Sequence, residues 1–142
     1  MKKKTNPVQQ EPQKKKRNGS YSKNKGNRYE QKIARELREL GFTGVKTSRT
    51  ESKEADNNKI DIVDTQKKLP VNIQLKKTQS IPSYFKIREE STVDPKSFCI
   101  IWAKQEKKEK NICTVGEAVI MDKQLFYELL KSYDNERNRS NV

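Results

Sequence analysis

The segment KIDIVDTQKKLPVNIQLKK, residues 59–77, contains two short strand-like runs separated by a polar turn. A turn centred between Lys67 and Lys68 pairs Asp61 with Gln74 across an antiparallel hairpin. Opposed side chains lie on one face with Cβ atoms about 4.5–5.5 Å apart, and the alternation of side chains adds Lys76 to that face. The other face is expected to be buried through Ile60, Ile62, Val71, Ile73 and Leu75.

The polar face of this hairpin permits two interpretations. An acid, an amide oxygen and a lysine suit metal-assisted hydrolysis of a phosphodiester, because carboxylate and carbonyl oxygens bind hard divalent cations. Glu30 is the candidate second acid, since it lies within one turn of the inward-facing Ile33 on a predicted helix. Spacing alone favours the other interpretation, an ordinary hairpin with a solvated polar face, because alternating strands with a polar outward face are common.

Helical and strand patterns follow one another along the rest of the chain. Apolar residues recur at helical spacing from Asn27, a candidate N-cap, to Leu40, and Gly41 ends this helix. The apolar run 97–104 predicts a central strand buried on both faces. Further strands are expected at 45–50, 59–64, 70–77 and 116–121. The segments between them are expected to be polar loops or turns at 51–58 and 104–112, and a short helix or irregular connector at 80–90. A last helix is expected at 122–133, with Asp122 as its cap and Leu125, Phe126, Leu129 and Leu130 facing inward. This order predicts an α/β (α+β) domain with a small mixed sheet of four to five strands flanked by helices.

The N-terminal segment is strongly basic. Residues 1–28 carry ten lysines and arginines against one acid, Glu11, and almost nothing apolar. Such a segment is expected to be disordered when free, because it cannot offset the entropy of ordering. It predicts a nucleic-acid-binding arm that acts by counterion release, and a solubilising or targeting tail is the alternative. The arm's candidate contacts are Lys14, Lys15, Lys16, Arg17, Lys23 and Lys25. The expected organisation is a tail at 1–26, a folded domain at 27–133 and a polar C-terminal tail at 134–142.

Composition limits the possible partners. The 142 residues carry a formal net charge of +13, with 30% hydrophobic and 36% charged residues, so one small domain with a modest core is expected. The excess positive charge indicates a polyanionic partner, nucleic acid in preference to a membrane surface. An intracellular protein is expected, because there is no membrane-spanning apolar run and no apolar segment of the kind found in secretory signals.

Composition also limits the possible chemistry. The absence of histidine removes general-base catalysis by His, Ser-His-Asp triads and His-metal sites. Cys99 and Cys113 make neither a zinc site nor a disulfide framework and are expected to be buried free thiols. Any reaction must therefore use carboxylates, lysine and a metal.

Four stretches in a fixed order resemble the restriction-endonuclease-like nucleases, the PD-(D/E)XK superfamily: KGNRYEQKIARELRELGF, VKTSRT, KIDIVD and VNIQLKK. Within that superfamily, residues from about Lys25 to Lys77 are similar to Holliday junction resolvases of the archaeal type and their phage-encoded relatives. The resemblance implies a Mg²⁺-dependent endodeoxyribonuclease that acts in DNA recombination, with Mn²⁺ expected to substitute. It further implies a homodimer acting on branched or double-stranded DNA, in the cytoplasm of a bacterial host if the protein is phage-encoded.

The resemblance also assigns roles to individual residues. It makes Asp61 the metal-binding aspartate, Lys76 the motif lysine and Glu30 the helix glutamate. It also implies that the carbonyl of Leu75 binds the metal and that Lys77 contacts the DNA backbone. Ser48 and Arg49 are implied to contact the scissile phosphate or the metal site.

Gln74 is the one departure from the motif, because it stands where the family has glutamate. Restriction nucleases of the Mrr type carry Gln-x-Lys at this point, and an amide oxygen still ligates a hard cation, although with one negative charge fewer. The departure leaves an alternative function open, namely a catalytically degenerate or non-enzymatic DNA-binding or packaging protein with the same fold.

Overall fold

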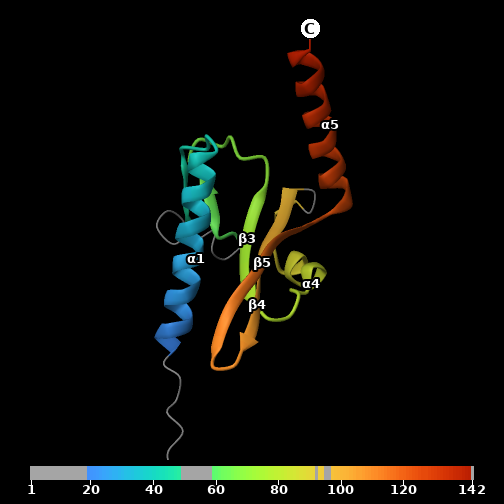
Figure 1. Ribbon diagram of the computed structural model, residues 1–142. Coiled ribbons are helices and arrows are strands. Elements are labelled where there is room, and N and C mark those ends of the chain that lie inside the picture. Colours follow the sequence, from blue (N-terminus) through green and yellow to red (C-terminus); the bar gives the residue numbers. More distant parts are fainter. Residues whose placement is uncertain (1–18, 49–58, 92, 95–96, 142) are drawn as a thin grey trace, which may run out of the picture.

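The computed structural model describes residues 19–48, 59–91, 93–94 and 97–141 (Figure 1). They form a five-stranded sheet in the order β1-β2-β3-β4-β5, accompanied by three helices. The elements are α1 (Gly19–Glu39), β1 (Val45–Thr47), β2 (Ile62–Asp64), β3 (Asn72–Thr78), α4 (Tyr84–Glu90), β4 (Phe98–Lys108), β5 (Asn111–Met121) and α5 (Lys123–Ser140). The predicted mixed α+β fold with four to five strands is therefore confirmed.

The sheet is antiparallel except between β3 and β4. These two strands run parallel, and the chain crosses between them through α4, as parallel neighbours require. β4 and β5 form a long hairpin whose pairing continues to Lys108 and Asn111. The turn predicted over 104–112 is therefore wrong in length, because the two strands continue pairing with each other beyond the end of β3.

Each face of the sheet carries its own hydrophobic cluster. On one face α1 packs through Tyr29, Ile33 and Ala34 onto apolar side chains that include Ile73 and Leu75. On the other face Tyr84 of α4 packs with Ile60, Phe98 and Ile100. Successive residues of β4 enter alternate clusters, which confirms the prediction that this strand is buried on both faces.

Three expectations about helix ends and thiols are corrected. α1 begins at Gly19, so Asn27 lies inside the helix instead of capping it, and residues 19–26 of the expected tail are helical. α5 continues to Ser140, although residues 134–140 were expected to form a polar tail. Once a packed helix exists, each further residue adds a hydrogen bond without a new nucleation cost.

Cys99 is buried as expected, but Cys113 is exposed on the β4–β5 hairpin. The N-cap Asp122 is confirmed, because its side chain accepts from the backbone N–H of Gln124.

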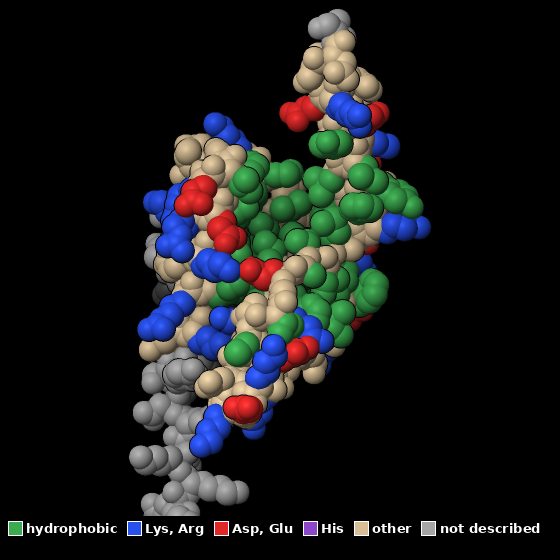
Figure 2. Space-filling model, viewed as in Figure 1, with side chains coloured by type: hydrophobic (Ala, Val, Ile, Leu, Met, Phe, Trp, Pro, Cys, Tyr) green, Lys and Arg blue, Asp and Glu red, His purple; other side chains and the backbone are tan. Residues whose placement is uncertain are grey.

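The apolar side chains of α5 are only partly covered. Leu125 is buried, but Phe126 and Leu130, which were expected to face inward, are each 48% exposed because α5 extends past the edge of the sheet (Figure 1). Figure 2 shows apolar side chains gathered on the face of the molecule between α1 and α5. Within the described ranges, no helix combines the length and the apolar character needed to cross a lipid bilayer.

Candidate active site

The hairpin formed by β2 and β3 is interrupted by a β-bulge at Asp61. Ile62 is the partner of Ile73, as the predicted register requires, but the backbone N–H of Asp61 also donates to the carbonyl of Ile73 at 2.9 Å. Two residues of one strand thus oppose a single residue of the other, and this breaks the alternation of side chains. Ile60 consequently packs with Tyr84 on the α4 face, and the prediction that it shares a face with Ile62 is wrong.

The bulge brings the carboxylate of Asp61 to the edge of β3. Its Oδ2 accepts a hydrogen bond of 2.8 Å from the backbone N–H of Leu75. The N–H and C=O of one strand residue point to the same side of the strand, so the Leu75 carbonyl lies on this edge too. Asp61 and the residues around Leu75 are therefore brought together, but through the strand edge and not through the shared face that regular alternation predicted.

Two buried oxygens next to this contact have no hydrogen-bond partner among the described residues. They are Oε1 of Gln74, which is 6% exposed, and Oγ of Ser48, which is 1% exposed. Gln74 precedes Leu75 on β3, and the backbone N–H of Ser48 donates to the carbonyl of Asp61 at 2.9 Å. Because buried polar atoms are nearly always hydrogen-bonded, unpartnered oxygens indicate positions for water or an ion.

Lys76 and Glu30 lie on opposite sides of the sheet. Lys76 is half-buried and is the pairing partner of Trp102, which packs on the α4 face together with Ile100, the partner of Gln74. Glu30 is 6% exposed and belongs to α1, which covers the other face. Of the predicted site residues, Asp61, Gln74, Leu75 and Lys76 thus lie together along β3, while Glu30 lies on the helix over the other face.

The predicted DNA contacts are only partly within the described residues. Lys23 and Lys25 lie on α1, where Lys23 is exposed and Lys25 is half-buried, and Lys77 lies near the end of β3. Arg49, Lys14, Lys15, Lys16 and Arg17 lie outside the described residues.

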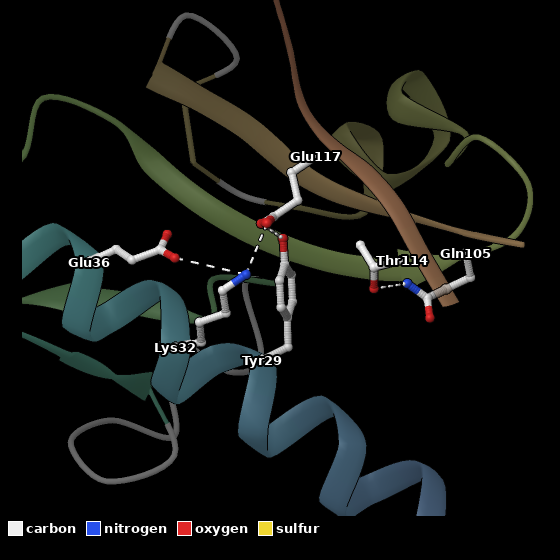
Figure 3. A network of polar contacts seen from close by, with 6 residues as sticks. All are labelled: Tyr29, Lys32, Glu36, Gln105, Thr114 and Glu117. Atoms are coloured by element: carbon white, nitrogen blue, oxygen red, sulfur yellow. Dashed lines mark hydrogen bonds and ion pairs between the residues drawn. The ribbon is translucent and has the colours of Figure 1, made fainter. Parts of the chain in front are cut away.

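A polar cluster on the α1 face was not predicted from the sequence. The hydroxyl of Tyr29 donates to Oε2 of Glu117, and Nζ of Lys32 donates to its Oε1, both at 2.9 Å (Figure 3). The ammonium groups of Lys32 and Lys77 lie 5.9 and 5.7 Å from the centroid of the Tyr29 ring. The only signal for this cluster in the sequence is Glu117 itself, a single acid within an otherwise apolar strand pattern.

Charge and burial shift the pKa values of the groups in this cluster. The hydrogen bond from Lys32 lowers the pKa of Glu117, and the bond from Tyr29 acts in the same direction. Burial lowers the pKa of Lys77, and the nearby charges of Lys25 and Lys32 lower it further. The cluster therefore joins α1 to β3 and β5. Counting Lys25 and also Glu36, which pairs with Lys32 at 3.8 Å, it contains three positive and two negative charges.

The donor atoms around Asp61 fit a hard divalent cation, although acids alone would not form the site. The described residues contain no group of three or more Asp, Glu, Cys or His side chains that could hold a metal ion. Magnesium, however, binds through one or two carboxylates together with neutral oxygens, waters and substrate phosphates. The carboxylate of Asp61, the carbonyl of Leu75 and the unpartnered Oε1 of Gln74 are donors of this kind.

Comparison with known proteins places these features in a family. The family model described as archaeal Holliday junction resolvase (Hjc) matches residues 21–115. The match runs from α1 through the Asp61 hairpin and β4 into β5, and so covers more than half of the chain. No curated protein and no solved structure matches.

Proposed function

Because the chain belongs to the archaeal Holliday junction resolvase family, which is a family of nucleases, we propose that it is a metal-dependent endonuclease that hydrolyses phosphodiester bonds of branched DNA. The observation that carries this proposal is the contact between Asp61 Oδ2 and the N–H of Leu75. It holds an acid at the backbone of the residue that follows Gln74, whose side-chain oxygen is buried without a partner among the described residues. A solvated hairpin would leave the Gln74 side chain exposed, whereas it is 6% exposed.

We propose that Asp61, Gln74 and the carbonyl of Leu75 hold a divalent cation such as Mg²⁺, with Mn²⁺ able to substitute. When bound, the cation polarises the scissile phosphate and lowers the pKa of water, which makes water a stronger nucleophile at neutral pH. Glu30 is the proposed second carboxylate, reaching the site from α1. Ser48, which is buried beside Asp61, supports that residue through its backbone N–H.

The protein's own contribution to the reaction is orientation and charge. The ammonium group of Lys76 is proposed to contact the scissile phosphate and stabilise the negative charge that develops on it. Asp61 is held by the main chain of Leu75, so its carboxylate loses little entropy when the substrate binds. Arg49 is proposed to contact the phosphate as well, in line with the family motif.

A second candidate function follows from one observation. Gln74 supplies a neutral oxygen where the family motif has glutamate, so the site has one negative charge fewer for a cation. A protein that binds junctions without cutting them would have this composition. The basic segment that includes Lys14, Lys15, Lys16, Arg17 and Lys23 is proposed to bind DNA under either function.

We further propose that the chain forms a homodimer through β5 and α5. A four-way junction has two strands to cut, and a two-fold dimer presents two equivalent sites. Exposed apolar side chains that lie close together typically form interfaces. On β5 and α5 these are Val119, Phe126, Tyr127, Leu130 and Tyr133, which are between 47% and 68% exposed.

The test of the proposed function is cleavage of labelled DNA by the full chain. A four-way junction, a flap and a linear duplex of the same sequence are incubated with Mg²⁺, with Mn²⁺ or with a chelator. We expect metal-dependent cutting of the junction and little cutting of the duplex. Tight binding of the junction without cutting in either metal would instead support the binding-only function.

A further inference from the structure

Two lysine ammonium groups lie against one tyrosine ring on the α1 face of the sheet, and a third lysine lies nearby. Lys25, Tyr29 and Lys32 are spaced by four and three residues, so they lie on the same side of α1. Lys77 reaches the same ring from β3, and its ammonium group lies 5.7 Å from the ring centroid. The three positive groups therefore meet between the helix and the strand.

The sheet beneath these lysines explains why they meet there. Lys77, Ala103 and Glu117 are pairing partners across β3, β4 and β5 and face α1. Ala103 is fully buried and small, which lets α1 approach the sheet closely. Glu117 then fixes the helix by accepting from both Tyr29 and Lys32 (Figure 3).

Glu117 offsets only part of this charge. Its carboxylate pairs with Lys32 at 2.9 Å, and Glu36 pairs with the same ammonium group at 3.8 Å. The two acids offset two of the three positive charges and leave one in excess. Burial and the two neighbouring lysines lower the pKa of Lys77, which means that the charged form of Lys77 is destabilised at this position. An anion between the lysines would remove this repulsion.

We propose that Lys25, Lys32 and Lys77 form a binding site for a backbone phosphate of DNA, separate from the scissile phosphate. The proposal rests on the proposed function in one respect, namely that the ligand is DNA. Lys76 and Lys77 follow one another on β3 and point to opposite faces of the sheet. In the described part of the chain, β2 pairs with β3 only at Ile62 and Ile73, so no described strand covers the β3 edge beyond this pair. DNA bound along that edge would contact Lys76, the proposed catalytic lysine, on one side and the three-lysine site on the other.

The experiment measures binding of a fluorescent four-way junction in a chelator, at several salt concentrations. Each phosphate contact contributes about 0.9 to the slope of log affinity against log salt. Lys77→Gln should therefore reduce the slope by about one and weaken binding about tenfold near 0.1 M salt. Lys25→Gln combined with Lys77→Gln should reduce the slope by about two.

Lys123→Gln is the matched control. Lys123 also lies over a tyrosine ring, at 5.8 Å from the centroid of Tyr127, but it belongs to α5 and is not part of the lysine cluster. The Lys123→Gln variant should show the same slope of log affinity against log salt as the native protein. An unchanged slope in Lys77→Gln, or an equal loss in the control, would overturn the proposal.

Glu117→Gln should change DNA affinity in the direction opposite to the lysine substitutions. Loss of the carboxylate leaves Lys32 with only the longer, exposed pair to Glu36 at 3.8 Å, so its ammonium group can turn to a phosphate. Affinity and slope should then both rise even if thermal stability falls. A purely structural cluster would give weaker binding together with the lower stability. Because binding is measured without metal, failure of junction cleavage would refute the proposed nuclease and leave this result unaffected.

Discussion

The carboxylate of Asp61 accepts a hydrogen bond of 2.8 Å from the backbone N–H of Leu75. In a regular hairpin, a backbone carbonyl of the neighbouring strand would occupy this position. The bulge at Asp61 replaces that carbonyl with a carboxylate, which places a negative charge beside the backbone of the Gln-x-Lys motif. The central residues of the candidate site are thus held by main-chain geometry.

Restoring an acid at Gln74 should strengthen metal binding. Gln74→Glu adds a negative charge with almost no change in shape, so we expect the Mg²⁺ concentration for half-saturation to fall about tenfold. Isothermal titration calorimetry of the DNA-free protein measures this directly. Gln74→Leu, which has no oxygen, is the comparison and should bind more weakly than the native protein. Equal affinities in all three proteins would show that residue 74 does not ligate the metal.

A charge on the apolar surface of α5 should separate the proposed dimer. Leu130→Lys introduces a charge at a side chain that is 48% exposed, so the folded monomer tolerates the change while an apolar interface does not. Analytical ultracentrifugation should then give a dimer for the native protein and a monomer for the variant. Lys131→Glu, at an exposed neighbouring position, is the control for altered charge on the same helix. A native protein that sediments as a monomer at high concentration contradicts the dimer.

Gly44 should be essential for the turn beside the hairpin. A Cβ atom at this position would lie 2.7 Å from Oδ1 of Asp64 and 2.8 Å from Oγ1 of Thr65. Asp64 cannot easily move, because its carboxylate accepts backbone hydrogen bonds from Gln66, Lys68 and Leu69. Gly44→Ala should lower the free energy of unfolding by about 1–3 kcal/mol, measured by urea denaturation.

Gly116→Ala is the control for this substitution. A Cβ at Gly116 meets no atom within 4 Å, so the variant should be as stable as the native protein or slightly more stable. Equal stability of the two alanine variants would exclude the close contact at Gly44.

The contact of Glu117 with α1 should weaken in acid. Hydrogen bonding to Lys32 lowers the pKa of Glu117 in the folded protein below its usual value of 4.5. The stabilisation is therefore complete above the unfolded pKa and is lost as the pH falls through the folded pKa. The Glu117 side chain is 35% exposed, so the effect should stay below about 1 kcal/mol.

Denaturation of the native protein and Glu117→Gln over this pH range checks the prediction. The native protein should be the more stable of the two at pH 6, and the difference should shrink as the pH falls below 4.5, the usual pKa of the group. A difference that is constant with pH would mean that the Glu117 carboxylate does not titrate with folding.

The sequence predicted what local rules control. Turn residues around Lys67 and Lys68 determined the hairpin register, and the Ile62 and Ile73 pair confirms it. The apolar run at 97–104 identified the central strand, because burial on both faces leaves few polar residues. The bulge at Asp61 could not be predicted, since it depends on Ile60 joining the separate cluster of Tyr84 and Phe98.

Contacts between distant segments explain the other differences. Tyr29 and Glu117 are 88 positions apart, and no periodicity within either segment indicates that they meet. The ends of α1 and α5 were underestimated because apolar spacing marks only the packed part of a helix. The roles assigned to Asp61, Gln74, Lys76 and Glu30 remain predictions.

The most direct test of the central claim is single-turnover cleavage of a four-way junction at increasing Mg²⁺ concentration. It compares the native protein with Asp61→Asn, which keeps the shape of the side chain and removes its charge. We predict that the native protein cuts with saturable Mg²⁺ dependence. The Asp61→Asn variant should bind the junction equally well and cut at least about 100-fold more slowly. Equal cleavage by the two proteins, or no cleavage by the native protein at any Mg²⁺ concentration, would contradict the account.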